Sequence, residues 1–285
     1  MRQIALATMI AASLGLALGA WATGEAETPD FDGYQRVLTE NLSITSRKGA
    51  PLETRFDYMR FKRNPDRRTH VKLLRIGLEA ATPSQMDRKT RHAWAVNAYN
   101  FFVLEAATEY LWRRVDRGFN RVASVSEITT PQGTFFKRVA IKVEGRSYTL
   151  DDFERHFLFA DHDRRSMSPP DSLDPRLHFA IVCGAVGCPP LLPRAYRPDS
   201  LDAQLDFAVR NALASPAHLT WDEKTRTLVA SSIFDWYAGD FGGQAGVLGF
   251  LERYAPSKVR SAIRSKKVKA ISRFIPWDWK LNQGP

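Results

Sequence analysis

A long apolar segment after Thr82-Pro83-Ser84 constrains the fold of this chain more than any other stretch. Pro83 suits the first turn of a helix, and Thr82 or Ser84 can cap it. From Trp94 onward, apolar side chains occupy nearly every face of the predicted helix, which extends to about Trp112. Such a helix has to be surrounded by other elements, so the pattern predicts a long, central, buried helix.

Shorter segments on both sides of this helix have the patterns of helices and hairpins. Helices are predicted at residues 31–42, 52–62, from 150 onward, and at 199–213, 231–237 and 247–254. Short antiparallel hairpins are predicted at residues 139–143 with 146–149 and at 218–221 with 227–230. The stretch at 177–183 is predicted as a buried strand. Because helices outnumber strands and no βαβ series occurs, we expect a single helix-rich α+β domain over residues 31–285.

The first 22 residues have the three parts of a secretory signal peptide. Arg2 supplies a positive charge, residues 4–20 form an uncharged and mostly apolar run, and Ala20-Trp21-Ala22 offers small residues where a signal peptidase reads. The alternative is an uncleaved membrane anchor, which the polar stretch after Ala22 disfavours. We therefore expect cleavage near Ala22, a flexible lead-in at residues 23–30, and a periplasmic or secreted protein without a transmembrane anchor.

The chain is basic, with a formal net charge of +10. Basic residues concentrate at 60–68 and again in a C-terminal segment that contains Arg260, Arg264, Lys266, Lys267, Lys269 and Arg273. A solvated surface is the simpler interpretation, and weak contact of the C-terminal segment with an anionic surface is the alternative. Neither concentration alternates with aromatic residues as a nucleic-acid platform does. The expected partner is a small molecule, a peptide or a cell-envelope ligand, not nucleic acid, and no cofactor is predicted.

The most informative segment for chemistry, residues 174–190, contains both cysteines of the chain. Gly184 and Gly187 allow the chain to turn so that Cys188 returns toward Cys183. Three interpretations remain open: a disulfide in an oxidising compartment, a reactive thiol activated by His178 or another base, and a metal site built on His178 and both cysteines. In a regular strand, His178 and Cys183 would point to opposite faces, which counts against their pairing.

Two further clusters carry polar groups in apolar surroundings. Asn97 and Asn100 share a face of the long helix, where their amides either bind neighbouring backbone or orient a catalytic group. Asp235 lies among aromatic residues and is a candidate partner for Arg176 or His178. The remaining histidines are interpreted as surface groups: His70, His92, His156, His162 and His218.

Eight motifs in this order resemble the family known as domain of unknown function 547. They are Trp94-Ala-Val-Asn97-Ala-Tyr99-Asn100, Leu150-Asp-Asp-Phe-Glu154, Asp174-Pro-Arg176-Leu-His178-Phe-Ala, Cys183-Gly-Ala-Val-Gly-Cys188-Pro-Pro, Ala195-Tyr196, Leu201-Asp-Ala-Gln-Leu205, Ile233-Phe-Asp235-Trp-Tyr237 with Asp240-Phe241, and Trp277-Asp-Trp279-Lys-Leu-Asn282. The resemblance covers about residues 50–283. It implies one α+β domain, often exported in bacteria, and it implies no activity. Its pattern includes Asn97, Asn100, Arg176, His178, Cys183, Cys188 and Asp235, but not His218.

Two functional hypotheses follow. The first is a binding or scaffold module with a Cys183–Cys188 disulfide, in which Asn100 and Arg176 belong to the binding set. The second is a thiol-dependent hydrolase or acyl transferase, with Cys183 as nucleophile, His178 as base, and Asp235 or Asn97 as the orienting group. The sequence leaves open whether the protein is an enzyme.

Overall fold

The computed structural model describes residue 29 and residues 31–115, 118–130, 133–137, 141–159 and 173–284. The predicted signal peptide and the lead-in, apart from Pro29, lie outside the described residues, as does His162.

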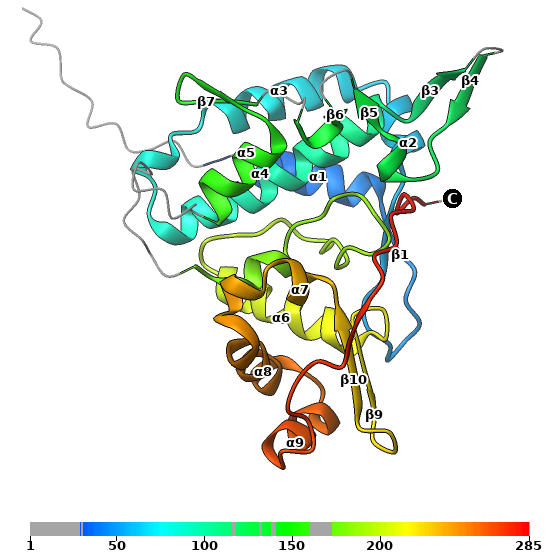
Figure 1. The fold of residues 1–285 in the computed structure, drawn as a ribbon. Coiled ribbons are helices and arrows are strands. Elements are labelled where there is room, and N and C mark those ends of the chain that lie inside the picture. Colours follow the sequence, from blue (N-terminus) through cyan, green and yellow to red (C-terminus); the bar gives the residue numbers. More distant parts are fainter. Residues whose placement is uncertain are drawn as a thin grey trace, which may run out of the picture.

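Helix α4 (Arg88–Glu109) runs through the centre of the N-terminal half, as predicted (Figure 1). Every side chain from Ala93 to Leu104 is buried. The predicted cap is wrong, because the side chain of Asp87 accepts the N–H groups of Lys89 and Thr90 and starts the helix there. Residues Pro83–Gln85 form a separate 3-10 turn, η1, before it.

Four helices and a helical turn surround α4. They are α1 (Phe31–Asn41), α2 (Tyr58–Arg63), α3 (Arg67–Ala80), α5 (Leu150–Phe153) and the π-helical turn η4 (Glu154–Leu158). The predicted helix at 52–62 is wrong in its first half. Residues Thr54–Phe56 form strand β2, which pairs with β1 (Leu42–Ile44), and Asp57 caps α2 behind it. Helix α3 was not predicted.

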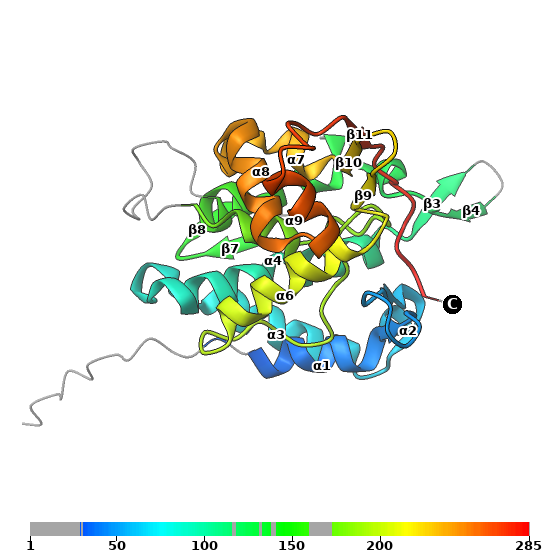
Figure 2. The same ribbon diagram turned by 90° about the horizontal axis from the view of Figure 1, so that it is seen from below.

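The elements of the C-terminal half lie together (Figures 1 and 2) and enclose a hydrophobic core of their own. Its helices are α6 (Leu201–Ala214), α7 (Ile233–Trp236), α8 (Gly243–Tyr254) and α9 (Ser257–Arg264). Its sheet contains β9 (Leu219–Asp222), β10 (Thr227–Ser231) and β11 (Arg273–Ile275), with β10 antiparallel to β9 and parallel to β11. The predicted hairpin of β9 and β10 is therefore confirmed, whereas α9 was not predicted.

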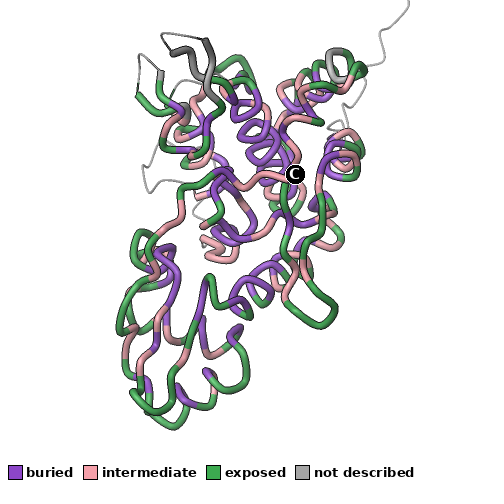
Figure 3. Tube along the Cα trace, turned by 90° about the vertical axis from the view of Figure 1, so that its right-hand side faces the viewer, coloured by how far each residue is buried: buried purple, intermediate pink, exposed green. Residues whose placement is uncertain are grey.

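Three small antiparallel pairs complete the N-terminal half. They are β3 (Trp112–Val115) with β4 (Gly118–Arg121), β5 (Thr129–Thr130) with β6 (Gly133–Thr134), and β7 (Ile141–Val143) with β8 (Arg146–Tyr148). The turn between β7 and β8 has positive φ at both Glu144 and Gly145, as a two-residue hairpin turn requires. The fold is thus α+β, as predicted, and its buried residues occupy the interior of both halves (Figure 3).

The predicted strand at residues 177–183 is wrong. Pro175–Phe179 form a 3-10 helix, η5, because Pro175 favours a first turn and the Asp174 side chain accepts the N–H of Arg176. The backbone of residues 180–182 then forms hydrogen bonds with a side chain and not with a neighbouring strand. The Asn100 amide donates to the carbonyl of Ala180 and accepts the N–H of Val182, both at 2.9 Å.

Residues 277–284, here called the C-terminal strap, lie along the cysteine loop and reach the N-terminal half (Figure 1). The N–H of Val186 donates to the Lys280 carbonyl, and that of Gly187 donates to the Asp278 carbonyl. The Asn282 N–H donates to the Gly184 carbonyl. The strap therefore fastens a loop that lies far from it in sequence.

Candidate functional site

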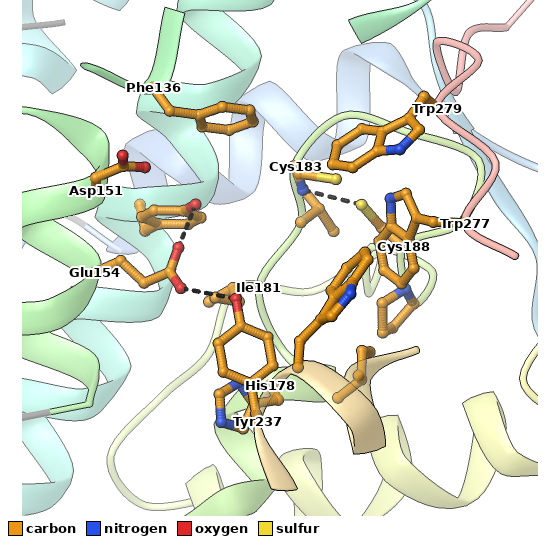
Figure 4. Close-up of a pocket in the computed structure, with 15 residues that line it drawn as sticks. Phe136, Asp151, Glu154, His178, Ile181, Cys183, Cys188, Tyr237, Trp277 and Trp279 are labelled. Carbon is orange, nitrogen blue, oxygen red and sulfur yellow. Dashed lines mark hydrogen bonds between the residues drawn. The ribbon is translucent and has the colours of Figure 1, made fainter. Parts of the chain in front are cut away.

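A pocket of about 180 Å³ lies where the two hydrophobic cores meet (Figure 4). It contains both cysteines, two carboxyl groups and a large aromatic surface. The lining residues are Tyr99, Phe136, Asp151, Glu154, His178, Ile181, Val182, Cys183, Cys188, Pro189, Ile233, Trp236, Tyr237, Trp277 and Trp279. Two of these tryptophans come from the strap, so distant parts of the chain build one site.

The loop between the cysteines returns on itself, as predicted. Gly184 has a φ of +81°, which side chains rarely adopt, and an added Cβ would lie 3.3 Å from the Tyr58 hydroxyl oxygen. After this turn, the N–H of Cys183 donates to the Cys188 Sγ over 3.0 Å. Both cysteines are free thiols in this structure, with Cys183 partly exposed and Cys188 buried.

The two thiols have opposite acid–base properties. The hydrogen bond from the Cys188 side chain, with backbone donors and against the effect of burial, holds the pKa of Cys183 below its usual value. Burial and the contact with Cys183 raise the pKa of Cys188 well above its usual value. Cys183 is therefore the residue of the pair that becomes a thiolate first, and Cys188 is its proton-bearing partner.

The indole of Trp277 adds a further donor beside this pair. Its N–H contributes to the lower pKa of Cys183. Within the described part of the chain, however, this buried nitrogen has no partner in hydrogen-bonding geometry. A buried, unpaired donor is unfavourable by about 1–3 kcal/mol, and this one lies beside the Cys183 thiol.

Both asparagines of α4 hold backbone, in agreement with the simpler of the two interpretations. Asn100 holds the segment directly before Cys183, as described above. Asn97 donates to the carbonyl of Tyr196 at 2.8 Å and accepts its N–H at 2.9 Å. Asn97 is buried and does not line the pocket, so its contact with the reacting groups would be indirect.

Glu154 lies across the pocket from the cysteines (Figure 4). It accepts the Tyr99 hydroxyl at 2.7 Å and the Tyr237 hydroxyl at 3.4 Å. Burial raises the pKa of Glu154, while the hydrogen bonds from the two tyrosines oppose that rise. The sequence did not predict Glu154, Tyr99 or Tyr237 as site residues, although all three belong to the eight motifs described above. Three acidic residues stand close together at 151, 152 and 154, so no local signal distinguishes Glu154 from its neighbours.

The sequence model of a family described as "Protein of unknown function, DUF547" matches residues 83–211. This region of the chain therefore belongs to the DUF547 family. A search of curated proteins and a search of solved structures found no match. The DUF547 match contains α4, η4 and the cysteine loop, whereas α7 and the strap complete the pocket from outside the matched residues.

His178, a residue of a DUF547 motif, is buried in a stack of aromatic rings. Its ring lies 4.0 Å from the ring centre of Phe159 on one side and 4.0 Å from that of Tyr237 on the other. Its Nε2 is 2.9 Å from an Asp240 carboxylate oxygen. Burial lowers the pKa of His178 to about 4 against the opposing effect of Asp240, so the ring is neutral near pH 7. The His178 ring thus packs directly against Tyr237, whereas its Nε2 is directed to Asp240 and not to Cys183.

The remaining DUF547 motif residues lie apart from the pocket. Arg176 binds three carboxylates, those of Asp174, Asp202 and Asp206. Asp235 is exposed on α7 and does not line the pocket. The suggestion that Asp235 pairs with Arg176 or His178 is wrong, because the structure gives each of them another partner.

Burial corrects one expectation about the histidines. His218 is buried at 3% exposure, so its interpretation as a surface group is wrong. Throughout the described ranges, no helix combines the length and apolar character needed to cross a bilayer. In the same ranges, no three His, Cys, Asp or Glu side chains gather in a way that could hold a metal ion.

Proposed function

We propose that this DUF547 protein is a thiol-dependent hydrolase or acyl transferase in which Cys183 is the nucleophile. The observation that carries the proposal is a partly exposed Cys183 whose pKa is lowered, foremost by a hydrogen bond from Cys188, inside a pocket. A thiolate is the nucleophilic form of cysteine, and this arrangement favours it without a neighbouring cation. The buried Cys188 does not compete, because its pKa is raised.

The proposed reaction is acyl transfer through a thioester. The Cys183 thiolate attacks the carbonyl carbon of an ester or amide, and the carbonyl electron pair moves onto oxygen. The unpaired Trp277 N–H is placed to stabilise that oxyanion. Collapse expels an alcohol or amine, which takes up a proton, and water or a second acceptor then releases Cys183 from the thioester. Glu154, with its raised pKa, is suited to accept and return protons across the pocket.

In this proposal His178 is a positioning residue and not the base. Its Nε2 is occupied by Asp240, and its ring supports the face of Tyr237. Tyr237 in turn donates to Glu154. Asn100 positions the backbone before Cys183, Asn97 holds the backbone of Tyr196, and Asp235 has no assigned step.

A binding module with a Cys183–Cys188 disulfide is the second candidate function. It is favoured by the contact between the two cysteines, which needs little movement to become a covalent bond. Such a staple would be expected in an exported protein, and we propose a periplasmic or secreted location on the strength of the N-terminal signal sequence.

Thiol counting separates the two candidates. The mature chain is produced in an oxidising compartment, denatured without reductant, alkylated with iodoacetamide and weighed intact. Two added groups support the enzyme, and a mass without added groups, lower by about two hydrogens, supports the disulfide module.

The pH dependence of alkylation then tests the nucleophile itself. Native Cys183 is expected to alkylate with a midpoint below that of an ordinary cysteine. Cys188→Ala removes the main donor and should raise this midpoint by about one pH unit or more, whereas Cys188→Ser retains a donor and should raise it less. An identical midpoint in wild type and Cys188→Ala would overturn the assignment of Cys183 as an activated thiol.

A further inference from the structure

The charge of the pocket is opposite to that of the molecule. The whole chain carries a formal net charge of +10. None of the described residues that line the pocket is a lysine or an arginine, and two of them, Asp151 and Glu154, are acidic. The cation that most affects Glu154 is Arg155, which is exposed and does not line the pocket. The site therefore disfavours carboxylate, phosphate and sulfate groups and favours a positive one.

Aromatic rings make up much of the remaining surface. Trp236, Trp277 and Trp279 form an aromatic wall, with ring centres of Trp236 and Trp277 at 4.9 Å and of Trp236 and Trp279 at 6.3 Å. Trp236 is 50% exposed and Trp279 is 40% exposed. Tyr99 and Tyr237 stand on the side of Glu154 (Figure 4). Such exposed rings beside a pocket keep their faces available to a ligand.

The combination of aromatic faces and a carboxyl group is suited to organic cations. A ring face carries negative charge from its quadrupole and attracts an ammonium group, with tryptophan the strongest of the aromatic side chains. The apolar faces also replace water around the alkyl groups of such a cation, which they do not do for a strongly hydrated metal ion. A carboxylate across the pocket then supplies the opposite charge in a partly desolvated site.

We propose that the pocket binds an alkylammonium group, held between the aromatic wall and Glu154. This inference rests on the proposed function in one respect: if Cys183 is the nucleophile, the alkylammonium group belongs to its substrate. The ligand is an amine, or a quaternary ammonium compound, with its acyl or other reacting group directed toward the cysteine loop. The binding step itself requires no reaction at Cys183.

The test is isothermal titration of the full chain with matched pairs of probes. Choline is compared with its neutral isostere 3,3-dimethylbutan-1-ol, and n-butylammonium with butan-1-ol. At least one cation should bind tenfold or more tightly than its neutral counterpart. Affinities that are equal within both pairs, or higher for the neutral member of both pairs, would overturn the proposal.

Variants assign the binding to this pocket. Trp236→Ala removes an exposed ring and Glu154→Gln removes the charge, and each should weaken cation binding about tenfold. Trp112→Ala is the matched control, because Trp112 is another exposed tryptophan that does not line the pocket. Unchanged binding in both Trp236→Ala and Glu154→Gln would place the cation elsewhere and contradict the inference.

The nucleophile and the cation site can fail separately. Cys183→Ala should retain cation binding, because the binding surface does not depend on the thiolate. Normal binding together with ordinary thiol alkylation would remove the proposed enzyme and keep the cation site. Alkylation of Cys183 with a low pH midpoint, without any preference for a cation, would keep the proposed enzyme and remove the cation site.

Discussion

The side-chain amide of Asn100 holds the backbone that leads into Cys183. The Asn100 amide satisfies a carbonyl and an N–H that would otherwise be buried without partners, directly before the nucleophile. Asn211 makes the same pair of bonds to one residue, accepting the Leu52 N–H at 2.7 Å and donating to its carbonyl at 3.0 Å. Among the described residues, Asn97, Asn100 and Asn211 thus make similar clamps, of which Asn100 lies next to the site and Asn211 lies outside it.

Asn100→Ala is expected to lower both stability and thiol reactivity. The variant leaves a buried N–H and a buried carbonyl unpaired, so the free energy of unfolding should fall by about 2–4 kcal/mol. The released loop should also slow alkylation of Cys183 at pH 7. Urea unfolding and timed iodoacetamide labelling of the folded protein measure the two effects.

Asn211→Ala is the control for this prediction. It should lower the free energy of unfolding by a comparable amount and leave the labelling rate of Cys183 unchanged. If both variants slowed labelling equally, the effect would be general loosening of the fold, and Asn100 would have no specific positioning role.

At the scale of elements, the strap is held to the cysteine loop by close backbone contact. Gly187 faces the strap so closely that an added Cβ would lie 2.9 Å from Trp277 Cδ2 and 3.0 Å from the Asp278 nitrogen. The glycine is required here for space and not for its φ. The two tryptophans of the strap reach the pocket only because this approach is possible.

Gly187→Ala is expected to displace the strap. Overpacking against backbone should lower the free energy of unfolding by about 1–3 kcal/mol and change the near-ultraviolet circular dichroism of the tryptophans. Gly239→Ala provides the comparison, because a Cβ at that position meets nothing within 4 Å. A Gly187→Ala protein with wild-type stability and spectrum would show that the strap accommodates a side chain.

Sequence patterns predicted those elements whose structure is determined by residues within the element itself. The apolar run at 93–104 indicated α4, and Glu144-Gly145 indicated the β7–β8 turn, because each signal lies inside its own element. The segment at 177–183 failed for a physical reason. Its apolar residues are those of a buried strand, but its backbone partner is the side chain of Asn100, which no local pattern reveals.

The candidate site was predicted only in part for the same reason. The return of Cys188 toward Cys183 follows from nearby glycines, and the structure contains it. Glu154, Tyr99 and the strap tryptophans come from other elements, and only the tertiary fold brings them to the cysteines. Asp235 was selected because aromatic residues surround it in the sequence. In the structure it lies on the exposed side of α7 and does not line the pocket.

At the scale of the whole molecule, two histidines, His178 and His218, are buried inside the fold. Burial lowers the pKa of His218 to about 4, and burial likewise lowers that of His178 to about 4. Unfolded histidine titrates near 6.5, so below that pH the unfolded state binds protons that the native state does not. The stabilisation is present above pH 6.5 and is lost as the pH falls toward 4.

Acid should therefore destabilise the protein in a defined range. Urea unfolding between pH 7 and pH 4 is expected to show a free energy that falls by on the order of 2 kcal/mol for His218 alone. His218→Gln removes the titrating ring and should flatten that part of the profile, although the variant is less stable at pH 7. A profile of unchanged slope in the variant would contradict the assignment.

The strap also has a consequence for the timing of assembly. A ribosome makes Cys183 well before Trp277 and Trp279, so the nascent chain holds a thiol without its aromatic wall. The pocket closes only after the last of these residues is free to dock. The pocket lining is therefore complete only after residue 279 has been made and has docked onto the cysteine loop.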